Sequence, residues 1–244
     1  MRNIRLVIEY DGTNYAGWQI QKNAKSIQGT LEAALKRVTD KKTRLISCGR
    51  TDSGVHAKDH VANFKTNSKI LLVNLQRGLN SVLPKDIVIK EAKEVPLDFN
   101  SRYDAKSKVY RYTILNRSYP QALYRDHLYY IPYKLDLSVM KREAKCLVGR
   151  HDFKSFQAAD KKERSSVRTI KNLKIRRKGD FIEIEIEADG FLYNMVRNIV
   201  GTLVDIGRGR FKAGSMKKIL KAKNRVLAGP TVPARGLCLV EVKY

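Results

Sequence analysis

The sequence predicts an α+β protein, because stretches with the two-residue period of strands are interspersed with stretches of helical period. The clearest strands form a hairpin at residues 173–187, where isoleucines alternate with charged residues around a Lys-Gly-Asp turn. The clearest helix is residues 192–206, whose apolar side chains cover roughly half the circumference at about 100° per residue. This helix is expected to be deeply buried.

The length of the chain fits two halves. Its 244 residues could form one large domain or two of ordinary size, and residues 96–108 are polar and without pattern. We therefore predict an N-terminal half at residues 1–105 and a C-terminal half at residues 106–244. Each half runs strand, helix, strands and helix, an order that permits a pseudo-twofold arrangement around a central mixed, mainly antiparallel sheet.

The N-terminal half begins with a strand in which Ile4, Leu6 and Ile8 share one face. Ser26 is a suitable N-cap for an amphipathic helix over residues 27–39. The pattern then predicts strands at residues 43–47, 60–64 and 87–95, with a helix at residues 71–80.

The C-terminal half begins with a strand at residues 109–114, where Tyr110 and Tyr112 share one face. Ordinary packing within the sheet is a sufficient explanation for both tyrosines. A helix at residues 135–147, the hairpin and the long apolar helix follow, and the chain ends with a Pro/Gly loop and a strand.

The hairpin carries three glutamates in alternate positions, Glu183, Glu185 and Glu187. They could be interpreted as paired catalytic carboxylates. Cross-strand pairing with the Lys and Arg residues of the neighbouring strand explains them better.

The charge of the chain points to a polyanionic partner. Lys and Arg outnumber Asp and Glu 49 to 24, which gives a net charge of +25. Such a surface attracts nucleic acid with a steep salt dependence. Arg164 and Arg168 lie in a short basic segment that we expect to face phosphates, and five tyrosines among basic residues at 119–133 suit base stacking, an interface or packing equally. A non-catalytic RNA-binding protein would show the same charge excess.

The cellular compartment of the protein is indicated by the lack of membrane-spanning and signal-peptide patterns in the sequence. No apolar run approaches the length that spans a bilayer, and the N-terminus leads directly into a strand pattern without a signal peptide. The three cysteines of the chain are far apart in the sequence and form no C-x-x-C pair. We expect a cytoplasmic protein with reduced thiols and no membrane segment.

A Gly-bracketed loop at residues 48–56, Cys-Gly-Arg-Thr-Asp-Ser-Gly-Val-His, can present one carboxylate, Asp52, to a ligand. Arg50 precedes it by two positions, and a nearby arginine favours the ionised form, which can attack carbon. The alternative is an Asx-turn with a solvated aspartate. His56 and His60 have a spacing seen in zinc sites, but no ligand set completes a tetrahedron, so we predict no metal.

The segment at residues 10–19 combines aromatic, amide and glycine residues. It suits a loop that touches a flat or sugar-like ligand, or equally a packed loop that uses Trp18 as a plug. In the long apolar helix, Arg197 lies at the rim of the apolar face and should need a carboxylate partner. Asp205, eight residues further on, points in another direction.

Four strings of this sequence resemble the tRNA pseudouridine synthase A family: residues 48–56, residues 10–19, the Lys-Val-Tyr-Arg-Tyr of residues 108–112, and Phe-Leu-Tyr-Asn-Met-Val-Arg-Asn-Ile-Val-Gly at residues 191–201. The resemblance extends over nearly the whole chain. It implies a pseudouridine synthase fold with a basic RNA-binding cleft between the halves, no cofactor, and a homodimer.

The resemblance also implies the activity and its residues. The chain would convert uridine to pseudouridine in tRNA, at positions 38, 39 and 40 of the anticodon stem-loop, with Asp52 as nucleophile or base. Arg197 would lie beside Asp52, Tyr110 would stack on the uracil, and Arg50 would hold phosphates of the displaced nucleotide. The alternatives are a synthase that acts on another RNA, such as ribosomal RNA, and a non-catalytic RNA-binding protein.

Overall fold

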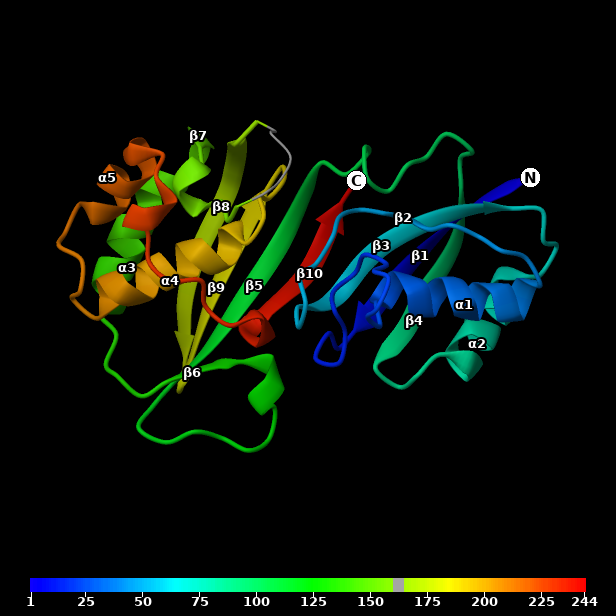
Figure 1. The fold of residues 1–244 in the computed structure, drawn as a ribbon, viewed down its shortest axis with the longest axis horizontal. Coiled ribbons are helices and arrows are strands. Elements are labelled where there is room, and N and C mark those ends of the chain that lie inside the picture. Colours follow the sequence, from blue (N-terminus) through cyan, green and yellow to red (C-terminus); the bar gives the residue numbers. More distant parts are fainter. Residues whose placement is uncertain (160–164) are drawn as a thin grey trace. The chain divides into compact units, whose positions relative to one another are not determined.

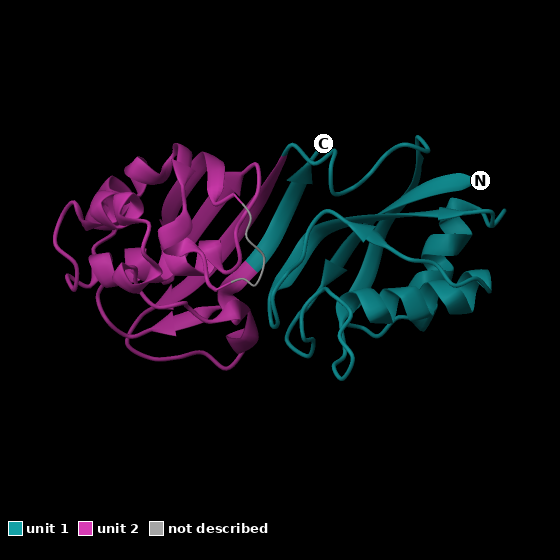
Figure 2. Cartoon of the chain, turned by 45° about the horizontal axis from the view of Figure 1, so that its top comes forward, with its two compact units in different colours: residues 1–106, 238–244 teal, residues 107–237 magenta. Residues whose placement is uncertain are grey.

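The structure is a computed structural model that describes residues 1–159 and 165–244. The chain forms two compact units: unit 1 comprises residues 1–106 and 238–244, and unit 2 comprises residues 107–237 (Figure 2). Each unit combines a sheet with helices, which confirms the predicted α+β class. Within the described residues, no helix is long and apolar enough to cross a membrane.

Unit 1 is built on a sheet of order β4-β1-β3-β10, with a short β2 beside β3. Its strands are β1 (Arg2–Tyr10), β2 (Ile46–Ser47), β3 (His56–Thr66), β4 (Ile87–Val95) and β10 (Leu237–Lys243), and its helices are α1 (Ile27–Thr39) and α2 (Leu72–Val82). β10 pairs parallel with β3, and all other pairs in this unit are antiparallel. The sheet is therefore mixed and mainly antiparallel, as predicted.

The core of unit 1 lies between this sheet and α1 and α2, which lie side by side (Figure 1). The side chain of Ser26 accepts a hydrogen bond from the amide of Gly29, which confirms the predicted N-cap of α1. The buried side chains alternate along β1 and recur at helical spacing in α1 and α2: Ile4, Leu6, Ile8, Leu31, Leu35, Leu75 and Leu79. Burying each of them contributes about 1.5–3 kcal/mol of transfer free energy.

The last strand lies in unit 1, whereas the sequence places residues 238–244 in the C-terminal half. Cys238 and Leu239 pair with His56 and Ala57 at the start of β3. Such a pairing between segments far apart in the sequence leaves no mark in the local pattern, which explains the difference. Among the described residues, Cys48, Cys146 and Cys238 form no disulfide.

Unit 2 has a sheet of order β5-β9-β8-β7, with β6 beside β5. Its strands are β5 (Ser107–Asn116), β6 (Tyr129–Ile131), β7 (Gly149–Asp152), β8 (Val167–Lys178) and β9 (Phe181–Ala188), and its helices are α3 (Leu137–Ala144), α4 (Met195–Gly207) and α5 (Ser215–Ala222). β8 and β9 are the predicted hairpin. Lys174 lies opposite Glu185 and Arg176 opposite Glu183, which confirms the predicted cross-strand pairing for these two glutamates, whereas Glu187 lies opposite Asn172.

The helix α4 is buried almost throughout, as its sequence predicts. A methyl group added to Gly201 would lie 1.8 Å from the carbonyl oxygen of Pro230, so the segment after residue 228 packs directly on the helix backbone. The fully buried Asn198 donates to the carbonyl oxygen of Phe156 and accepts from Thr231. These contacts give α4 a rigid support.

Some elements differ from their predicted bounds. β3 begins at His56 instead of residue 60, β2 is two residues long, and α3 ends at Ala144 and continues as a 3-10 turn to Leu147. The predicted helix at residues 71–80 is observed two residues longer at its C-terminal end, and the strand at residues 87–95 has the predicted bounds.

Candidate active site

The predicted catalytic loop connects β2 to β3 in unit 1. Arg50 is exposed, Asp52 is half-buried, and Thr51 between them is buried, with 6% of its surface accessible. The loop therefore holds its backbone inside the protein and directs the arginine toward solvent. An aspartate in such a loop is partly shielded from water, unlike the solvated aspartate of an ordinary surface turn.

The loop at residues 10–18 fixes the backbone on both sides of Asp52. The amide of Trp18 donates to the carbonyl oxygen of Thr51 at 3.1 Å. The carbonyl oxygen of Tyr15 accepts from the amide of Gly54 at 3.3 Å and from the side chain of Ser53 at 3.1 Å. Asp52 is therefore placed by hydrogen bonds to the residues directly before and after it.

Two glycines let these loops approach closely. Gly17 has a φ of +92°, and a methyl group added to it would lie 2.6 Å from the carbonyl oxygen of Thr51. The same addition at Gly12 would lie 2.1 Å from the carbonyl oxygen of Val55. Only glycine fits at either position, because backbone atoms occupy the space of a side chain.

Aromatic residues of this segment pack against the predicted catalytic loop and the adjoining strand β3. The hydroxyl of Tyr10 lies 2.8 Å from Oγ1 of Thr51 and 3.3 Å from Nδ1 of His60, and the ring of Trp18 stacks on His60 at 3.8 Å between centroids. Trp18 has only 1% of its surface exposed. The ring of Trp18 is therefore packed as a plug, whereas ligand contact by the segment at residues 10–19, in which Thr13 and Asn14 are exposed, stays a prediction.

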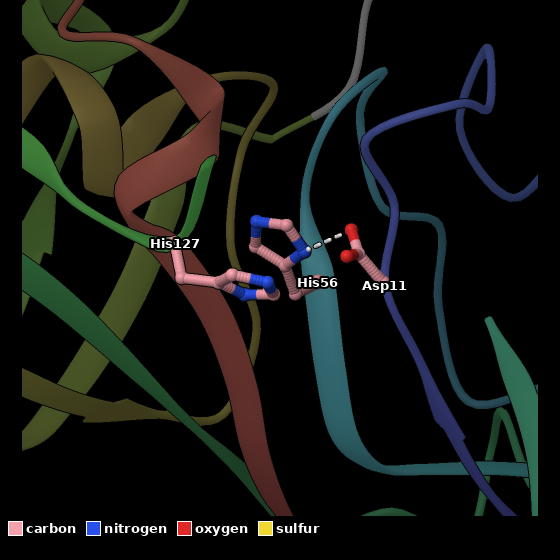
Figure 3. Close-up of side chains that lie close together, drawn as sticks. All are labelled: Asp11, His56 and His127. Atoms are coloured by element: carbon pink, nitrogen blue, oxygen red, sulfur yellow. Dashed lines mark ion pairs between the residues drawn. The ribbon is translucent and has the colours of Figure 1, made fainter. Parts of the chain in front are cut away.

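His56 begins β3 directly after the catalytic loop. Its Nδ1 accepts a hydrogen bond from the amide of Gly12 at 3.1 Å and lies 3.1 Å from Oδ1 of Asp11 (Figure 3). One nitrogen cannot accept from the amide and donate to the carboxylate at once. We assign the amide bond to the neutral ring and the ion pair to the protonated ring.

In unit 2, Tyr110 lies on β5 opposite Ile186 of β9. Its ring meets Phe191 edge to face at 5.0 Å between centroids, and 9% of the residue is exposed. Tyr112 is fully buried on the same face, donates to the carbonyl oxygen of Pro233 at 2.7 Å, and has its pKa raised by that burial. The predicted alternation is confirmed, and it leaves Tyr110 as the less buried of the two rings.

Arg197 lies in the first turn of α4 and is half-buried. Its Nε donates to the carbonyl oxygen of Val232 at 2.8 Å, and its Nη1 donates to Oδ1 of Asn194 at 2.8 Å. Two fixed acceptors restrict the rotation of the guanidinium. Asp205 pairs with Arg210 at 3.2 Å, in agreement with the expectation that it is not the partner of Arg197.

Arg168 is one of the two arginines that the sequence predicts to face phosphates. Nη1 of Arg168 donates to the carbonyl oxygens of Ser165 and Val167 at 2.8 and 2.6 Å, so this side chain orders its own segment. Arg164 lies outside the described residues. RNA binding by either arginine stays a prediction.

Sequence reasoning did not find several residues that position the candidate site. Tyr10, Gly17 and Thr51 hold the loop of Asp52, and Asn194 and the carbonyl of Val232 hold Arg197. The i, i+3 spacing of Asn194 and Arg197 is a signal that could have been used. The close approach of Gly17 to Thr51 could not have been predicted from the sequence, because it depends on the fold.

The strings around the candidate residues agree with a comparison with protein families. The model of a family described as tRNA pseudouridine synthase matches residues 6–104 and 144–244. The chain belongs to the tRNA pseudouridine synthase family. It is an RNA pseudouridine synthase, an enzyme of the isomerase class. The matched ranges include Asp52 and Arg197 but not Tyr110.

Full-length relatives in this family are about as long as this chain. A protein named tRNA pseudouridine synthase A from Acetivibrio thermocellus is 50% identical over 244 residues, which is 100% of both chains. One named tRNA pseudouridine synthase A 2 from Clostridium perfringens has the same identity and coverage. A chain from the crystal structure of an archaeal box H/ACA sRNP Nop10-Cbf5 complex matches with a TM-score of 0.35 and 11% identity, over 93% of this chain and 59% of that one.

Proposed function

We propose that this enzyme converts uridine to pseudouridine in tRNA, at positions 38, 39 and 40 of the anticodon stem-loop, with Asp52 as the reacting carboxylate. The names of its full-length relatives support the tRNA substrate. The net charge of +25 supports binding to a polyanion. The observation that carries the proposal is the half-buried Asp52, held on a loop whose backbone is fixed on both sides.

The reaction exchanges one bond for another within a single nucleotide. The bond from N1 of uracil to C1′ of the ribose breaks, the base turns, and a bond from C5 to C1′ forms. The proton that leaves C5 is balanced by the proton that N1 gains, so neither a redox cofactor nor a second substrate is consumed. Asp52 serves as nucleophile or base for the first bond that breaks.

Asp52 must be ionised to act in either way. We propose that Arg197 lies beside it in the working enzyme and favours the carboxylate, because an adjacent cation lowers the pKa of an acid. The support comes from the geometry of Arg197 in unit 2, where Val232 and Asn194 fix the direction of its guanidinium. A fixed guanidinium loses little side-chain entropy when it binds a carboxylate.

Two further residues take part in holding the nucleotide. We propose that Tyr110 stacks on the uracil, since Phe191 fixes the orientation of its ring. Arg50 is exposed two positions before Asp52 and would bind phosphates of the extruded nucleotide. We also propose a homodimer, which size-exclusion chromatography with light scattering would test.

The decisive experiment incubates the pure protein with an unmodified tRNA transcript and maps pseudouridine. The wild type should form it at positions 38–40 where these are uridines, and Asp52→Asn should form it far more slowly while it still binds the tRNA. Asp40→Asn is the matched control, because Asp40 is exposed at the C-cap of α1 in a left-handed conformation that Asn also adopts. Equal product from Asp52→Asn and the wild type would refute the assignment of Asp52.

A further inference from the structure

The tyrosine-rich segment at residues 119–133 is divided by the structure into two groups. Tyr129 and Tyr130 are half-buried. Tyr119, Tyr124 and Tyr133 are exposed, with 60%, 74% and 55% of their surfaces accessible. Simple packing therefore does not account for the exposed three. The segment also lies outside the ranges that the family model matches.

Two of the exposed rings are stacked against arginines. The guanidinium carbon of Arg117 lies 4.0 Å from the centre of the Tyr119 ring, and that of Arg208 lies 4.1 Å from the centre of the Tyr133 ring. Each arginine covers one face of a ring that is otherwise more than half exposed. An arginine and an aromatic ring in this arrangement offer a flat, cationic surface to a planar ligand.

The first of these pairs is held in place by the backbone. Nε of Arg117 donates to the carbonyl oxygen of Tyr119 at 3.0 Å, and Nη2 donates to that of Pro120 at 3.3 Å. Nη1 pairs with Asp180 at 3.3 Å. The stack therefore exists before a ligand arrives, which lowers the entropy lost on binding.

The two pairs lie at the same end of unit 2. β5 and β6 are parallel, so the residues that follow each strand leave the sheet on the same side (Figure 1). The side chain of Asn116 donates to the carbonyl oxygen of Tyr133 at 2.7 Å, and the hydroxyl of Tyr130 donates to that of Ser118 at 2.8 Å. We name Arg117, Tyr119, Tyr133 and Arg208 the Arg–Tyr surface.

The surroundings of the Arg–Tyr surface are basic. The hairpin between β8 and β9 lies next to this surface, because the side chain of Arg177 donates to Oδ1 of Asn116, which itself donates to the carbonyl oxygen of Tyr133. The neighbouring segments at residues 116–134 and 176–180 contain more cationic than acidic residues: Arg117, Arg125, Lys134, Arg176, Arg177 and Lys178 against Asp126 and Asp180. Nucleic acid is the partner that combines negative charge with planar rings.

We infer that the Arg–Tyr surface binds unpaired bases of the RNA substrate, as an RNA contact additional to the catalytic residues. Unpaired bases in RNA loops stack on tyrosine rings and guanidinium planes, whereas paired bases are hidden in the helix. The inference rests on the proposed function in one respect, that the substrate is a folded RNA with loops. It assigns the surface to affinity and not to the chemical step.

The test compares Tyr119→Ala/Tyr133→Ala with the wild type on an unmodified tRNA transcript. Each lost stacking contact weakens binding by about tenfold, so the Kd of the double variant, which loses two contacts, should rise by about a hundredfold. The single-turnover rate at saturating enzyme should stay within about twofold of the wild type. Tyr103→Ala is the matched control, because Tyr103 is 76% exposed beside Arg102 but belongs to unit 1.

A second variant keeps a flat ring and reports on stacking directly. Tyr119→Trp adds an exposed indole, while the native Trp18 is 1% exposed and gives a constant background. The emission of the new indole should be quenched when tRNA binds. Unquenched emission would overturn the inference, and so would a Kd of the alanine double variant within about twofold of the wild type. Either result would indicate that the surface binds a protein partner instead of RNA.

These results separate the inference from the proposed function. A wild-type protein that binds tRNA through Tyr119 but forms no pseudouridine would overturn the proposed function alone. A protein that forms pseudouridine, and whose double variant binds tRNA as tightly as the wild type, would overturn the inference alone.

Discussion

Gly17 lies against the backbone of Thr51 so closely that a methyl group on it would come within 2.6 Å of the Thr51 carbonyl oxygen and 3.1 Å of the carbonyl carbon of Asp52. The next residue, Trp18, donates its amide to the same oxygen at 3.1 Å. The position of Asp52 therefore depends on a second loop that is distant in the sequence.

Replacement of Gly17 by alanine should displace the catalytic loop. The change combines a backbone clash with a φ of +92°, so we expect a loss of about 3 kcal/mol or more in the free energy of unfolding. Pseudouridine formation should fall further than stability alone explains, because Asp52 moves with Thr51. Urea unfolding and single-turnover rates would measure the two effects.

The control is Gly209→Ala, which has a similar φ of +76° with no atom within 4 Å of the added methyl group. It should cost about 1 kcal/mol from backbone strain and leave the turnover rate unchanged. Equal effects from the two variants would show that the contact with Thr51 is unimportant.

The hydrogen bond between Tyr10 and Thr51 should contribute to the stability of unit 1. The two hydroxyl oxygens are 2.8 Å apart in a buried position. Tyr10→Phe and Thr51→Val should each destabilise the protein by about 1 kcal/mol, and the double variant should lose less than the sum. Strictly additive losses in thermal unfolding would indicate that the two hydroxyls do not interact.

Acid should lower the stability of unit 2 in part because the carboxylate of Asp152 becomes protonated. Burial raises the pKa of this carboxyl, but hydrogen bonds from Ser166, Lys223 and the amide of Lys154 outweigh it, so its pKa is below the ordinary value of 3.8. A lowered pKa stabilises the folded state above about pH 3.8, and this stability is lost as the pH falls through the folded-state pKa.

The corresponding variant is Asp152→Asn, followed by unfolding measurements from pH 7 to pH 2. Its deficit relative to the wild type should be largest near neutral pH and should shrink below about pH 4. Asp40→Asn, at an exposed position, is the control substitution. Parallel curves for Asp152→Asn and the wild type would contradict the role of Asp152.

Arg50 should make a phosphate contact. Arg50→Gln should weaken tRNA binding. It should also reduce the slope of a plot of log Kd against log salt concentration by about one. Lys69→Gln is the control, because Lys69 is also exposed but follows the opposite end of β3 from the catalytic loop. An unchanged slope for Arg50→Gln would argue against the contact.

Much of the fold could be predicted from periodicity, because burial of one face repeats along each element. Ile182, Ile184 and Ile186 are all fully buried on β9, and the bounds of α1 and β4 agree with their patterns. The start of β3 was missed because Lys58 and Asp59 interrupt the apolar run. Asp59 is compensated by Lys90 at 2.6 Å, a contact between strands that no local pattern reveals.

The sequence names the candidate site residues, whose role stays a prediction, but it does not name the contacts that hold them. The string around Asp52 and the one around Arg197 identify both side chains from the sequence alone. Their positions depend on contacts between distant segments, such as Gly17 with Thr51 and Arg197 with Val232. A backbone carbonyl as a partner leaves no trace in residue identity, so such contacts come only from the structure.

The most direct test of the account is a double-mutant cycle of single-turnover pseudouridine formation with Asp52→Asn, Arg197→Gln and the combined variant. If Arg197 acts by keeping Asp52 ionised, the combined variant should be no slower than Asp52→Asn alone, since residues that act as a unit are not additive. Effects of the two changes that multiply in the combined variant, or a wild-type rate for Asp52→Asn, would contradict it.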